Sequence, residues 1–518
     1  MRRAVLLGLL LLVFFGLRMP SLRLLPLYSD EGLGLWRAER VLEGSLTRGS
    51  GEGKPLHAWI LAAAIALPGD DIAAARAAHV LAGALLVVAL WDLARRRRCP
   101  TAGWTAAALW IVLPFPSIFE RTVTPDVPLA AAGTAVAACA MRVAMPDRPE
   151  RRAWLYLLLA TGAAAMFTKM PVGLLLAATP LLVPFTLAPE ARPVAWRRLR
   201  PYWIALGGTV ATLTAVVATR AALDLRPLGF GMHEFRRKVA VLRDADRAPS
   251  AVVENLRRLG EYAWLYLGPV GTLLVVAAIV GVWFSRNRLV RVFLGFALAW
   301  TVLFAASARN LSAHYLLAAL PFYVLAMTWV LVGVASALGQ RAGRLVVAAA
   351  LAAILGLSWP LRRAQWMDPA TAKLASTERS HYVDGEWSGY GLPDAARWIE
   401  HELASGGAGA KSAEPVFIAV HLADYERLRL YASESARRSI AQVQVDRYTL
   451  RVPTMIDRAR AMVASGRRVF LVVGSERRFE RRWRQAFPQA VARATFPKPG
   501  GLHATVVWEL APEGTPSS

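Results

Sequence analysis

Two neighbouring carboxylates and one lysine near the N-terminus are the residues best suited to chemistry. Asp30 and Glu31 follow an almost wholly apolar opening segment, and Lys54 lies in a Gly-rich loop that ends at Pro55. A carboxylate can accept a proton as a general base. A lysine beside the N–H groups of a helix start is suited to hold a phosphate. The pattern therefore indicates acid–base chemistry next to an anion.

Each of these residues also has a structural interpretation. Ser29 before two acids is a typical helix start, because the serine caps free N–H groups and the acids favour the positive end of the helix dipole. Pro125 and Asp126 mark a second such start. Lys54 can be a solvated loop lysine. Because Asp30 and Asp126 both fall at the outer ends of predicted spans, we favour one shared cavity over two unrelated caps.

Other cations and histidines along the chain carry weaker signals. Lys169 and Arg121 can snorkel from an apolar segment to the membrane interface. The stretch "GFGMHEFRRKVAVL" can hold an anionic head group, but a solvated basic helix face is slightly favoured. Its candidate residues are His233, Arg236 and Arg237. The histidines show no metal-ligand spacing such as H-E-x-x-H, so a divalent metal stays possible but unassigned.

The composition is that of an integral membrane protein. The 518 residues are 56% hydrophobic, and apolar runs of about 20 residues, long enough to cross a bilayer, recur along the chain. The net charge of +25 comes from arginines that punctuate these runs, which indicates membrane topology rather than nucleic-acid binding. The two cysteines, Cys99 and Cys139, fit neither a disulfide framework nor a metal site. The N-terminal segment lacks a cleavage site and predicts an uncleaved first span.

The hydropathy pattern predicts an α-helical polytopic protein with about eleven transmembrane helices. The candidate spans are 4–18, 72–94, 102–116, 127–145, 153–168, 170–188, 202–220, 262–284, 289–307, 313–338 and 343–359.

The arginine-rich connections fix the predicted orientation of these spans. All of them fall on one side of an eleven-span arrangement, together with Arg2 and Arg3. The positive-inside rule makes that side cytoplasmic. We therefore predict a multi-pass protein of the inner (plasma) membrane whose polar candidates and C-terminal region lie on the periplasmic side.

The C-terminal region differs in character from the spans. Isolated apolar runs at 415–420, 467–474 and 503–510 alternate with helix-like stretches at 392–404 and 455–465. This alternation predicts a small α/β domain. The sequence thus predicts two domains, a membrane domain over 1–359 and an extracytoplasmic α/β domain over 360–518.

The order of the polar motifs resembles a known enzyme family. An acid pair after the first span is followed by a Gly-Lys-Pro loop, then by "RTVTPDVPL", "GAAAMFTKMPVGLLLA" and "HYLLAALPFYVLA". This ordered set is similar to that of the type C membrane glycosyltransferases that use polyprenyl-phosphate sugars. The most similar by pattern are the dolichyl-phosphate-mannose protein mannosyltransferases and the lipid A aminoarabinose transferases. The resemblance covers roughly residues 1–340.

The resemblance implies roles for individual residues. Asp30 matches the family's catalytic carboxylate, with Glu31 as its usual neighbour, and Asp126 matches the second acidic position. Lys54 matches the lysine that contacts the lipid-linked phosphate, and Tyr315 a tyrosine near that phosphate. The basic outer-loop cluster of the family corresponds to His233 with Arg236 or Arg237.

The sequence also departs from the family pattern in one place. The aminoarabinose transferases carry an acid before the loop lysine, whereas Gly53 stands there in this chain. This departure argues against a metal bound through that acid, and it also loosens the assignment of the substrate.

Together these features predict a glycosyltransferase. The expected reaction moves a sugar from a polyprenyl phosphate, a membrane lipid, to an extracytoplasmic lipid, polysaccharide or protein. The cations would hold the departing phosphate, and Asp30 would take the acceptor's proton. A transporter or flippase of lipid-linked sugars is the alternative, although transporters place their polar residues near the midplane rather than at one face. A catalytically silent scaffold is the third possibility.

Overall fold

The computed structural model of the chain shows two compact units. It describes residues 2–45, 53–95, 100–145, 151–170, 172–222, 248–285, 287–308, 310–405, 415–419, 422–441, 452–474 and 483–510. The helical unit contains Met1–Leu22 and Arg37–Trp366. The sheet unit contains Arg23–Trp36 and Met367–Ser518. Helix α2 (Ser29–Leu42) therefore begins in the sheet unit and ends in the helical unit.

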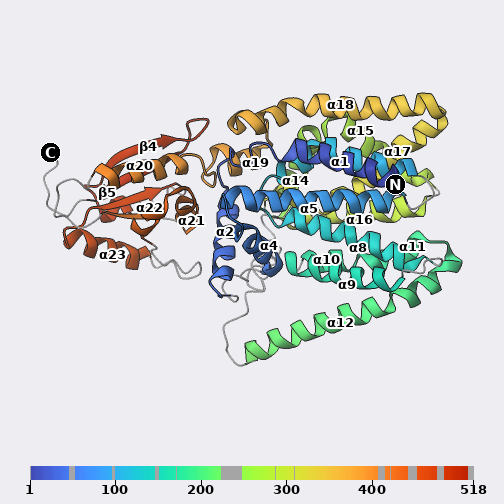
Figure 1. Cartoon of the computed structure of the whole chain (residues 1–518), viewed down its shortest axis with the longest axis horizontal. Coiled ribbons are helices and arrows are strands. Elements are labelled where there is room, and N and C mark those ends of the chain that lie inside the picture. Colours follow the sequence, from blue (N-terminus) through green and yellow to red (C-terminus); the bar gives the residue numbers. More distant parts are fainter. Residues whose placement is uncertain are drawn as a thin grey trace. The chain divides into compact units, whose positions relative to one another are not determined.

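The described part of the helical unit consists of long apolar helices and several short ones (Figure 1). Its helices are α1 (Arg2–Arg18), α4 (Pro55–Ile65), α5 (Asp71–Ala94), α6 (Pro100–Val112), α7 (Pro114–Phe119), α8 (Asp126–Ala144), α9 (Arg151–Thr168), α10 (Val172–Ala177), η3 (Thr179–Leu182), α11 (Val183–Thr186), η4 (Pro189–Ala191), α12 (Arg192–Ala222), α14 (Ala248–Tyr262), η5 (Ala263–Leu267), α15 (Gly268–Phe284), α16 (Arg288–Ser307), η6 (Ala313–Leu316), α17 (Leu320–Ala337) and α18 (Gln340–Met367).

Six helical segments of the described residues are long and apolar enough to cross a membrane. They are Asp71–Ala94, Asp126–Ala144, Pro249–Val282, Arg288–Ser307, Leu320–Ala337 and Gln340–Met367. The prediction of a polytopic helical fold is confirmed, whereas the number of eleven spans stays a prediction. The predicted domain boundary at 359/360 falls inside α18.

Three predicted spans are not continuous helices: 102–116 is divided into α6 and α7, 313–338 into η6 and α17, and 170–188 is also interrupted. The stretch 170–188 is divided into α10, η3 and α11. Pro180 and Pro184 lie in the first turns of η3 and α11, where a missing N–H does no harm, but neither proline can continue a preceding helix. Helix α10 folds back on α9 so closely that a side chain at Gly173 would meet the Ala165 carbonyl oxygen.

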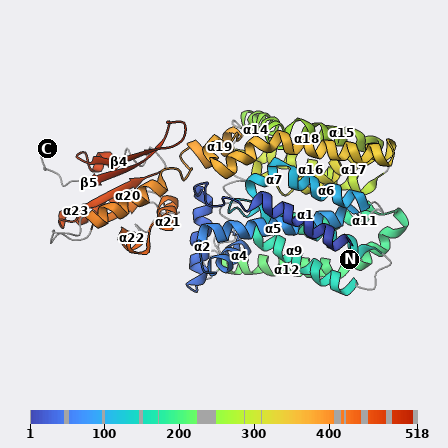
Figure 2. The same ribbon diagram turned by 45° about the horizontal axis from the view of Figure 1, so that its top comes forward.

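Helix α8, which begins at the predicted site residue Asp126, packs between α5 and α9 (Figure 1). Helix α8 is buried along nearly its whole length. Small residues such as Gly133 let neighbouring helices approach it closely, as is usual between membrane helices. Helix α12 runs along the outer side of α8 and α9 (Figure 2).

The sheet unit is an α/β domain, as the alternating pattern of the tail predicts. Its elements are η7 (Pro369–Thr371), α19 (Ser376–Arg379), η8 (Ser380–Asp384), α20 (Leu392–Ser405), β1 (Val416–Ala419), α21 (Leu422–Tyr431), α22 (Glu434–Ser439), β2 (Ile440–Ala441), α23 (Val452–Ala464), β3 (Val469–Val473), β4 (Val491–Pro497) and β5 (Ala504–Leu510). The three predicted apolar runs form β1, β3 and β5. The sequence pattern did not predict β2 and β4.

The five strands form one mixed sheet in the order β2-β1-β3-β5-β4. Strands β2, β1 and β3 are parallel, and β5 is antiparallel to both β3 and β4. Side chains alternate between the two faces, so Phe470 packs into one apolar core and Leu471 into the other. Because helices cover both faces, β3 is buried throughout and its sequence is continuously apolar.

Candidate functional site

Asp30 and Glu31 occupy the first turn of α2, within the sheet unit. The Glu31 side chain is fully buried, and its Oε2 accepts a hydrogen bond from the backbone N–H of Tyr28 at 2.9 Å. This bond satisfies a backbone donor at the helix start, as the glutamate of a capping box does. Asp30 is exposed. The two carboxylates thus have different surroundings, and Asp30 is the one that a substrate can reach.

Lys54 lies directly before α4, in the helical unit. Gly53 adopts a left-handed conformation, φ +72°, and its carbonyl oxygen accepts a hydrogen bond from the N–H of Met170 at 2.8 Å. Pro55 then opens the helix, where its fixed φ is favourable. The loop that carries Lys54 is therefore joined by its backbone to the segment that follows α9.

Asp126 and Lys169 form an ion pair at one end of the helical unit. Lys169 Nζ lies 2.7 Å from Asp126 Oδ1, and both side chains are largely buried. Asp126 begins α8, and Lys169 follows the last residue of α9. Burying two charges costs free energy that good pairing geometry must offset, so the pair marks a site that merits a functional test.

Aromatic and cationic groups surround this ion pair. Lys169 Nζ lies 5.2 Å from the centre of the Tyr315 ring, within the range of a cation–π interaction. The Tyr315 and His314 rings lie 4.4 Å apart. Lys54 and His314 also interact electrostatically with Asp126. The structure thus brings together three residues predicted from the sequence, Lys54, Asp126 and Tyr315.

Two histidines form a buried pair beside these cations. His57 Nε2 lies 3.1 Å from His79 Nε2, and His79 Nδ1 lies 2.9 Å from the Ala75 carbonyl oxygen. Because a carbonyl only accepts, His79 Nδ1 carries a proton, and a neutral His79 then accepts from the Nε2–H of His57. Burial, followed by the proximity of His79 and Lys54, lowers the pKa of His57 well below its ordinary value. Burial therefore favours the neutral form of the His57 ring.

The described residues offer no complete metal site. No three His, Cys, Asp or Glu side chains converge in the part of the chain that the structure describes. His57 and His79 direct their Nε2 atoms at each other. The divalent metal that the sequence leaves possible stays a prediction.

The prediction that Arg121 snorkels to the membrane interface is wrong, because Arg121 is buried and binds backbone groups. Its side chain is buried and donates to the carbonyl oxygens of Arg18 at 3.0 Å, Ser21 at 3.3 Å and Gln365 at 3.2 Å. Burial, and the neighbouring Arg18 and Arg76, lower the pKa of Arg121 to about 9. Arg121 thus ties chain segments of the helical unit together.

Three predicted residues cannot be placed. His233, Arg236 and Arg237 lie outside the described residues.

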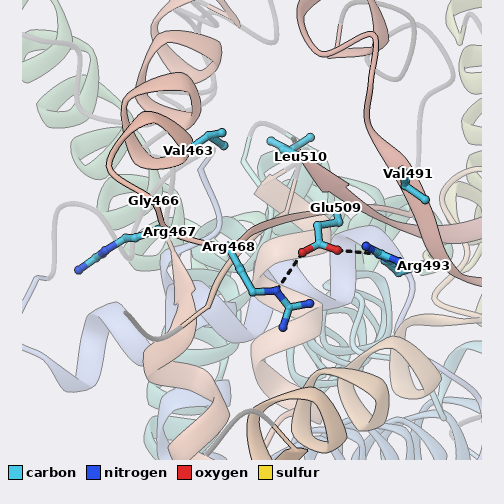
Figure 3. A pocket seen from close by; sticks show the side chains of 8 residues that line it. All are labelled: Val463, Gly466, Arg467, Arg468, Val491, Arg493, Glu509 and Leu510. Carbon is cyan, nitrogen blue, oxygen red and sulfur yellow. Dashed lines mark hydrogen bonds and ion pairs between the residues drawn. The ribbon is translucent and has the colours of Figure 1, made fainter. Parts of the chain in front are cut away.

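The sheet unit contains a separate pocket of about 300 Å³, shown in Figure 3. Glu509 accepts hydrogen bonds there from Arg468 at 2.9 Å and Arg493 at 2.6 Å. Arg468 also donates to Glu402 at 2.7 Å. The arginines already have carboxylate partners, so the pocket is explained as a surface ion-pair network rather than a site for an anion.

Sequence reasoning underrated Lys169. Taken alone, a lysine at the end of an apolar run is typical of snorkelling. Its position held a stronger signal, because Asp126 begins one helix and Lys169 follows the next, so both fall at the same end of an antiparallel pair. That relation between opposite charges predicts their contact.

The comparisons with known proteins agree with the predicted family. Residues 52–219 match the family model of the dolichyl-phosphate-mannose-protein mannosyltransferases. A crystal structure of ArnT from Cupriavidus metallidurans in the apo state matches with a TM-score of 0.61 at 17% identity, over 99% of each chain. The same protein bound to undecaprenyl phosphate matches with a TM-score of 0.57 at 18% identity, also over 99% of each chain. No curated protein matches significantly.

These matches bear directly on the classes of protein considered above. They give no support to a transporter or flippase. The fold, the family match over residues 52–219 and the resemblance in sequence agree: the chain has the fold of ArnT, and this part of it resembles the mannosyltransferase family.

Proposed function

We propose that the protein transfers one sugar from a polyprenyl phosphate carrier to an acceptor hydroxyl on the periplasmic side of the inner membrane. The observation that carries the proposal is the group of cations around Asp126, with Lys169 paired to it and the Lys54 loop tied to the same segment. ArnT, whose fold the chain shares, binds undecaprenyl phosphate in the second matched structure. A lipid phosphate is the ligand that such a group would take.

The proposed reaction is a direct displacement at the anomeric carbon. The acceptor oxygen forms a bond to this carbon while the bond from carbon to phosphate oxygen breaks. The acceptor's proton passes to the Asp30 carboxylate, and the electron pair of the broken bond leaves with the polyprenyl phosphate. Attack opposite the leaving group inverts the anomeric configuration.

The cations serve the leaving group in this proposal. Negative charge grows on the phosphate as the sugar departs, and the Lys54 and Lys169 ammonium groups stabilise it. Asp126 orients Lys169 through their 2.7 Å contact. Tyr315 borders the same ammonium with its ring. Asp30 rather than Glu31 is the proposed base, because Glu31 is buried and holds the Tyr28 N–H.

The proposed orientation of the protein in the membrane rests on the distribution of arginines between the two ends of α5 and α8. The arginine-rich stretches 95–99 and 142–152 lie at the C-terminal ends of α5 and α8, which by the positive-inside rule supports a cytoplasmic position for these ends. Asp126 lies at the opposite end of α8. This arrangement supports an active site that faces the periplasm.

The test of the function compares cell envelopes and purified enzyme. Mass spectrometry of envelope glycolipids and glycoproteins, with and without the protein, identifies the product and its acceptor. The purified enzyme is then assayed for release of polyprenyl phosphate from polyprenyl-phosphate sugars. Asp30→Asn keeps the size of the side chain but loses the base, and should slow transfer about 10²–10⁴-fold.

Two results would contradict this function. One is movement of intact donor across vesicle membranes without sugar transfer, which would restore the transporter alternative. The other is a near wild-type rate for Asp30→Asn at equal amounts of folded enzyme, which would move the base to another residue. Glu31→Gln is the matched control for the loss of a neighbouring carboxylate.

A further inference from the structure

The turn that precedes Asp30 is held by side chains from a distant part of the sheet unit. The N–H of Leu27 donates to the Tyr431 hydroxyl at 2.6 Å, and the Leu27 carbonyl oxygen accepts from Arg427 Nη1 at 3.1 Å. Both side chains belong to α21. A single helix of the C-terminal region thus satisfies both backbone groups of the residue before Tyr28.

Arg427 also joins a second segment of the chain, the one around Trp387, to this turn. The guanidinium is fully buried, forms an ion pair with the buried Asp424, and donates to the Trp387 carbonyl oxygen at 2.8 Å. That oxygen also accepts from the N–H of Ser29 at 3.3 Å. Arg427 and the N–H of Ser29, the residue before Asp30, therefore share the Trp387 carbonyl oxygen as an acceptor. A buried arginine whose donors meet three acceptors fixes their relative positions.

The segment around Trp387 is itself fixed by a buried lysine. Lys498 Nζ lies within hydrogen-bond distance of four carbonyl oxygens: those of Gly385 (3.1 Å), Glu386 (3.1 Å), Ser388 (3.0 Å) and Gly474 (2.8 Å). Its backbone closes the turn between β4 and β5, since its N–H donates to the His503 carbonyl oxygen at 2.8 Å. The carbonyl of Trp387 is therefore presented by a rigid segment tied to the sheet.

Packing adds to these hydrogen bonds. The Tyr28 ring stacks on His381 and also meets Tyr382, each with ring centres 5.1 Å apart. The backbones at Leu27 and Gly389 are so close that a Cβ at position 389 would lie 2.3 Å from the Leu27 carbonyl oxygen. Residues 27–29 are thus held by several contacts within the sheet unit.

We propose that Arg427 is a positioning residue for the reaction and acts through the Leu27–Ser29 turn to set the orientation of Asp30. The sheet unit is then part of the catalytic machinery rather than an appendage. The inference rests on the proposed function, in which Asp30 is the base. Orientation matters because a displacement of about 1 Å in a reacting group can cost about 10²-fold in rate.

The test is a double-mutant cycle between positions 427 and 30 in the full-length enzyme. Arg427→Met should lower kcat about 10- to 100-fold and leave the donor KM within about twofold, because the base acts in the chemical step rather than in donor binding. In an Asp30→Asn enzyme the same change should have almost no further effect, since the residue through which it acts is already disabled.

A milder variant covers the case in which Arg427→Met does not fold. Tyr431→Phe removes only the hydroxyl that accepts the Leu27 N–H, and should lower kcat about threefold to tenfold, again only when Asp30 is present. The matched control is Arg437→Met. Arg437 donates to the Ala432 carbonyl oxygen at 3.0 Å in the same unit, away from residues 27–29, and its loss should leave kcat unchanged.

The outcomes separate this inference from the proposed function. If Asp30→Asn transfers sugar at the wild-type rate, the assignment of the base fails, and the positioning role fails with it. If Asp30→Asn is slow, but the folded variant at 427 or 431 lowers kcat by the same factor with and without Asp30, only the positioning role is overturned. A rise in donor KM with unchanged kcat would also overturn it.

Discussion

The two ends of the α5, α8 and α9 group each carry a carboxylate paired with a cation, yet the pairs are built differently. At one end both oxygens of Asp92 accept hydrogen bonds from Arg142, and Arg95 donates to the same carboxylate. The Arg142 guanidinium also lies 3.8 Å from the centre of the Trp154 ring. At the other end, Asp126 meets Lys169 through one oxygen.

The difference shows how a structural ion pair differs from one that can work on a substrate. The planar guanidinium of Arg142 fits a carboxylate with two parallel bonds, and stacking on Trp154 fixes it further. Lys169 is a compact ammonium on a flexible stem, with Lys54 and His57 nearby. It can shift its contacts towards a phosphate at small cost. We therefore expect the Asp126 end to govern activity and the Asp92 end to govern stability.

The largest expected difference is topological: we expect the Asp92 end and the Asp126 end to lie on opposite sides of the membrane. Reporters fused within 95–98 and after Gly391 should give opposite signals, cytoplasmic for the first and periplasmic for the second, because the arginine-rich connections stay inside. Paired reporters of the two compartments read both positions. Cytoplasmic signals from both fusions would contradict the predicted orientation of the helices in the membrane.

The next largest effect concerns activity at the Asp126 end. Lys169→Met and Asp126→Asn should each lower the rate of sugar transfer about 10²-fold, since each removes part of the group that stabilises the departing phosphate. Release of polyprenyl phosphate by equal amounts of folded enzyme is the measurement. Arg142→Met is the matched control and should keep its activity per folded molecule. Equal losses at both ends would abolish the distinction.

Lys54 tests whether the same end binds the donor. Lys54→Ala should raise the donor KM about 10- to 100-fold, because a charge-assisted hydrogen bond contributes about 1.5–3 kcal/mol and 1.4 kcal/mol corresponds to about tenfold. The exposed Lys373 offers a control, Lys373→Ala, with no expected change. Unchanged donor kinetics in Lys54→Ala would show that this lysine is only a loop residue.

The Asp92 end should respond in stability instead. Asp92→Asn leaves Arg142 without its buried counter-charge, and breaking a buried pair in this way costs about 3–5 kcal/mol. Thermal unfolding in detergent measures the loss as a lower Tm, while the specific activity of the remaining folded enzyme stays near that of the wild type. A stable but inactive Asp92→Asn enzyme would reverse the roles of the two ends.

The smallest expected effect is a pH dependence at the Asp126 end. The pKa of His57 is lowered in the folded protein, so the unfolded chain binds the proton more readily. Stability is then fully present above the unfolded pKa of about 6.5 and decreases as the pH falls below it. His57→Gln should weaken this dependence between pH 7 and 5 in thermal unfolding. Identical pH profiles for the two proteins would show that His57 does not contribute.

Much of the molecule could be predicted from local sequence. Apolar runs near the length of a bilayer predicted most of the long helices, and strand-length apolar runs predicted β1, β3 and β5. Both predictions succeed because a segment buried in lipid or in a protein core must have apolar side chains. The edge strand β4 escaped prediction because its residues are mostly exposed. The span at 170–188 was wrong because hydropathy does not register what Pro180 and Pro184 do to a helix.

The sequence by itself determined the class of the protein, the helical membrane fold and the small set of polar residues at the helix ends. Only the tertiary structure decided how these residues pair and which are buried. Asp30 and Glu31 are neighbours of one chemical type, but about 100° of helical rotation separates them, so one is exposed and the other holds a backbone N–H. Arg427 lies far along the chain from Leu27, and no local pattern could join them. Contacts between distant segments depend on the packing of the whole unit, which neither composition nor periodicity encodes.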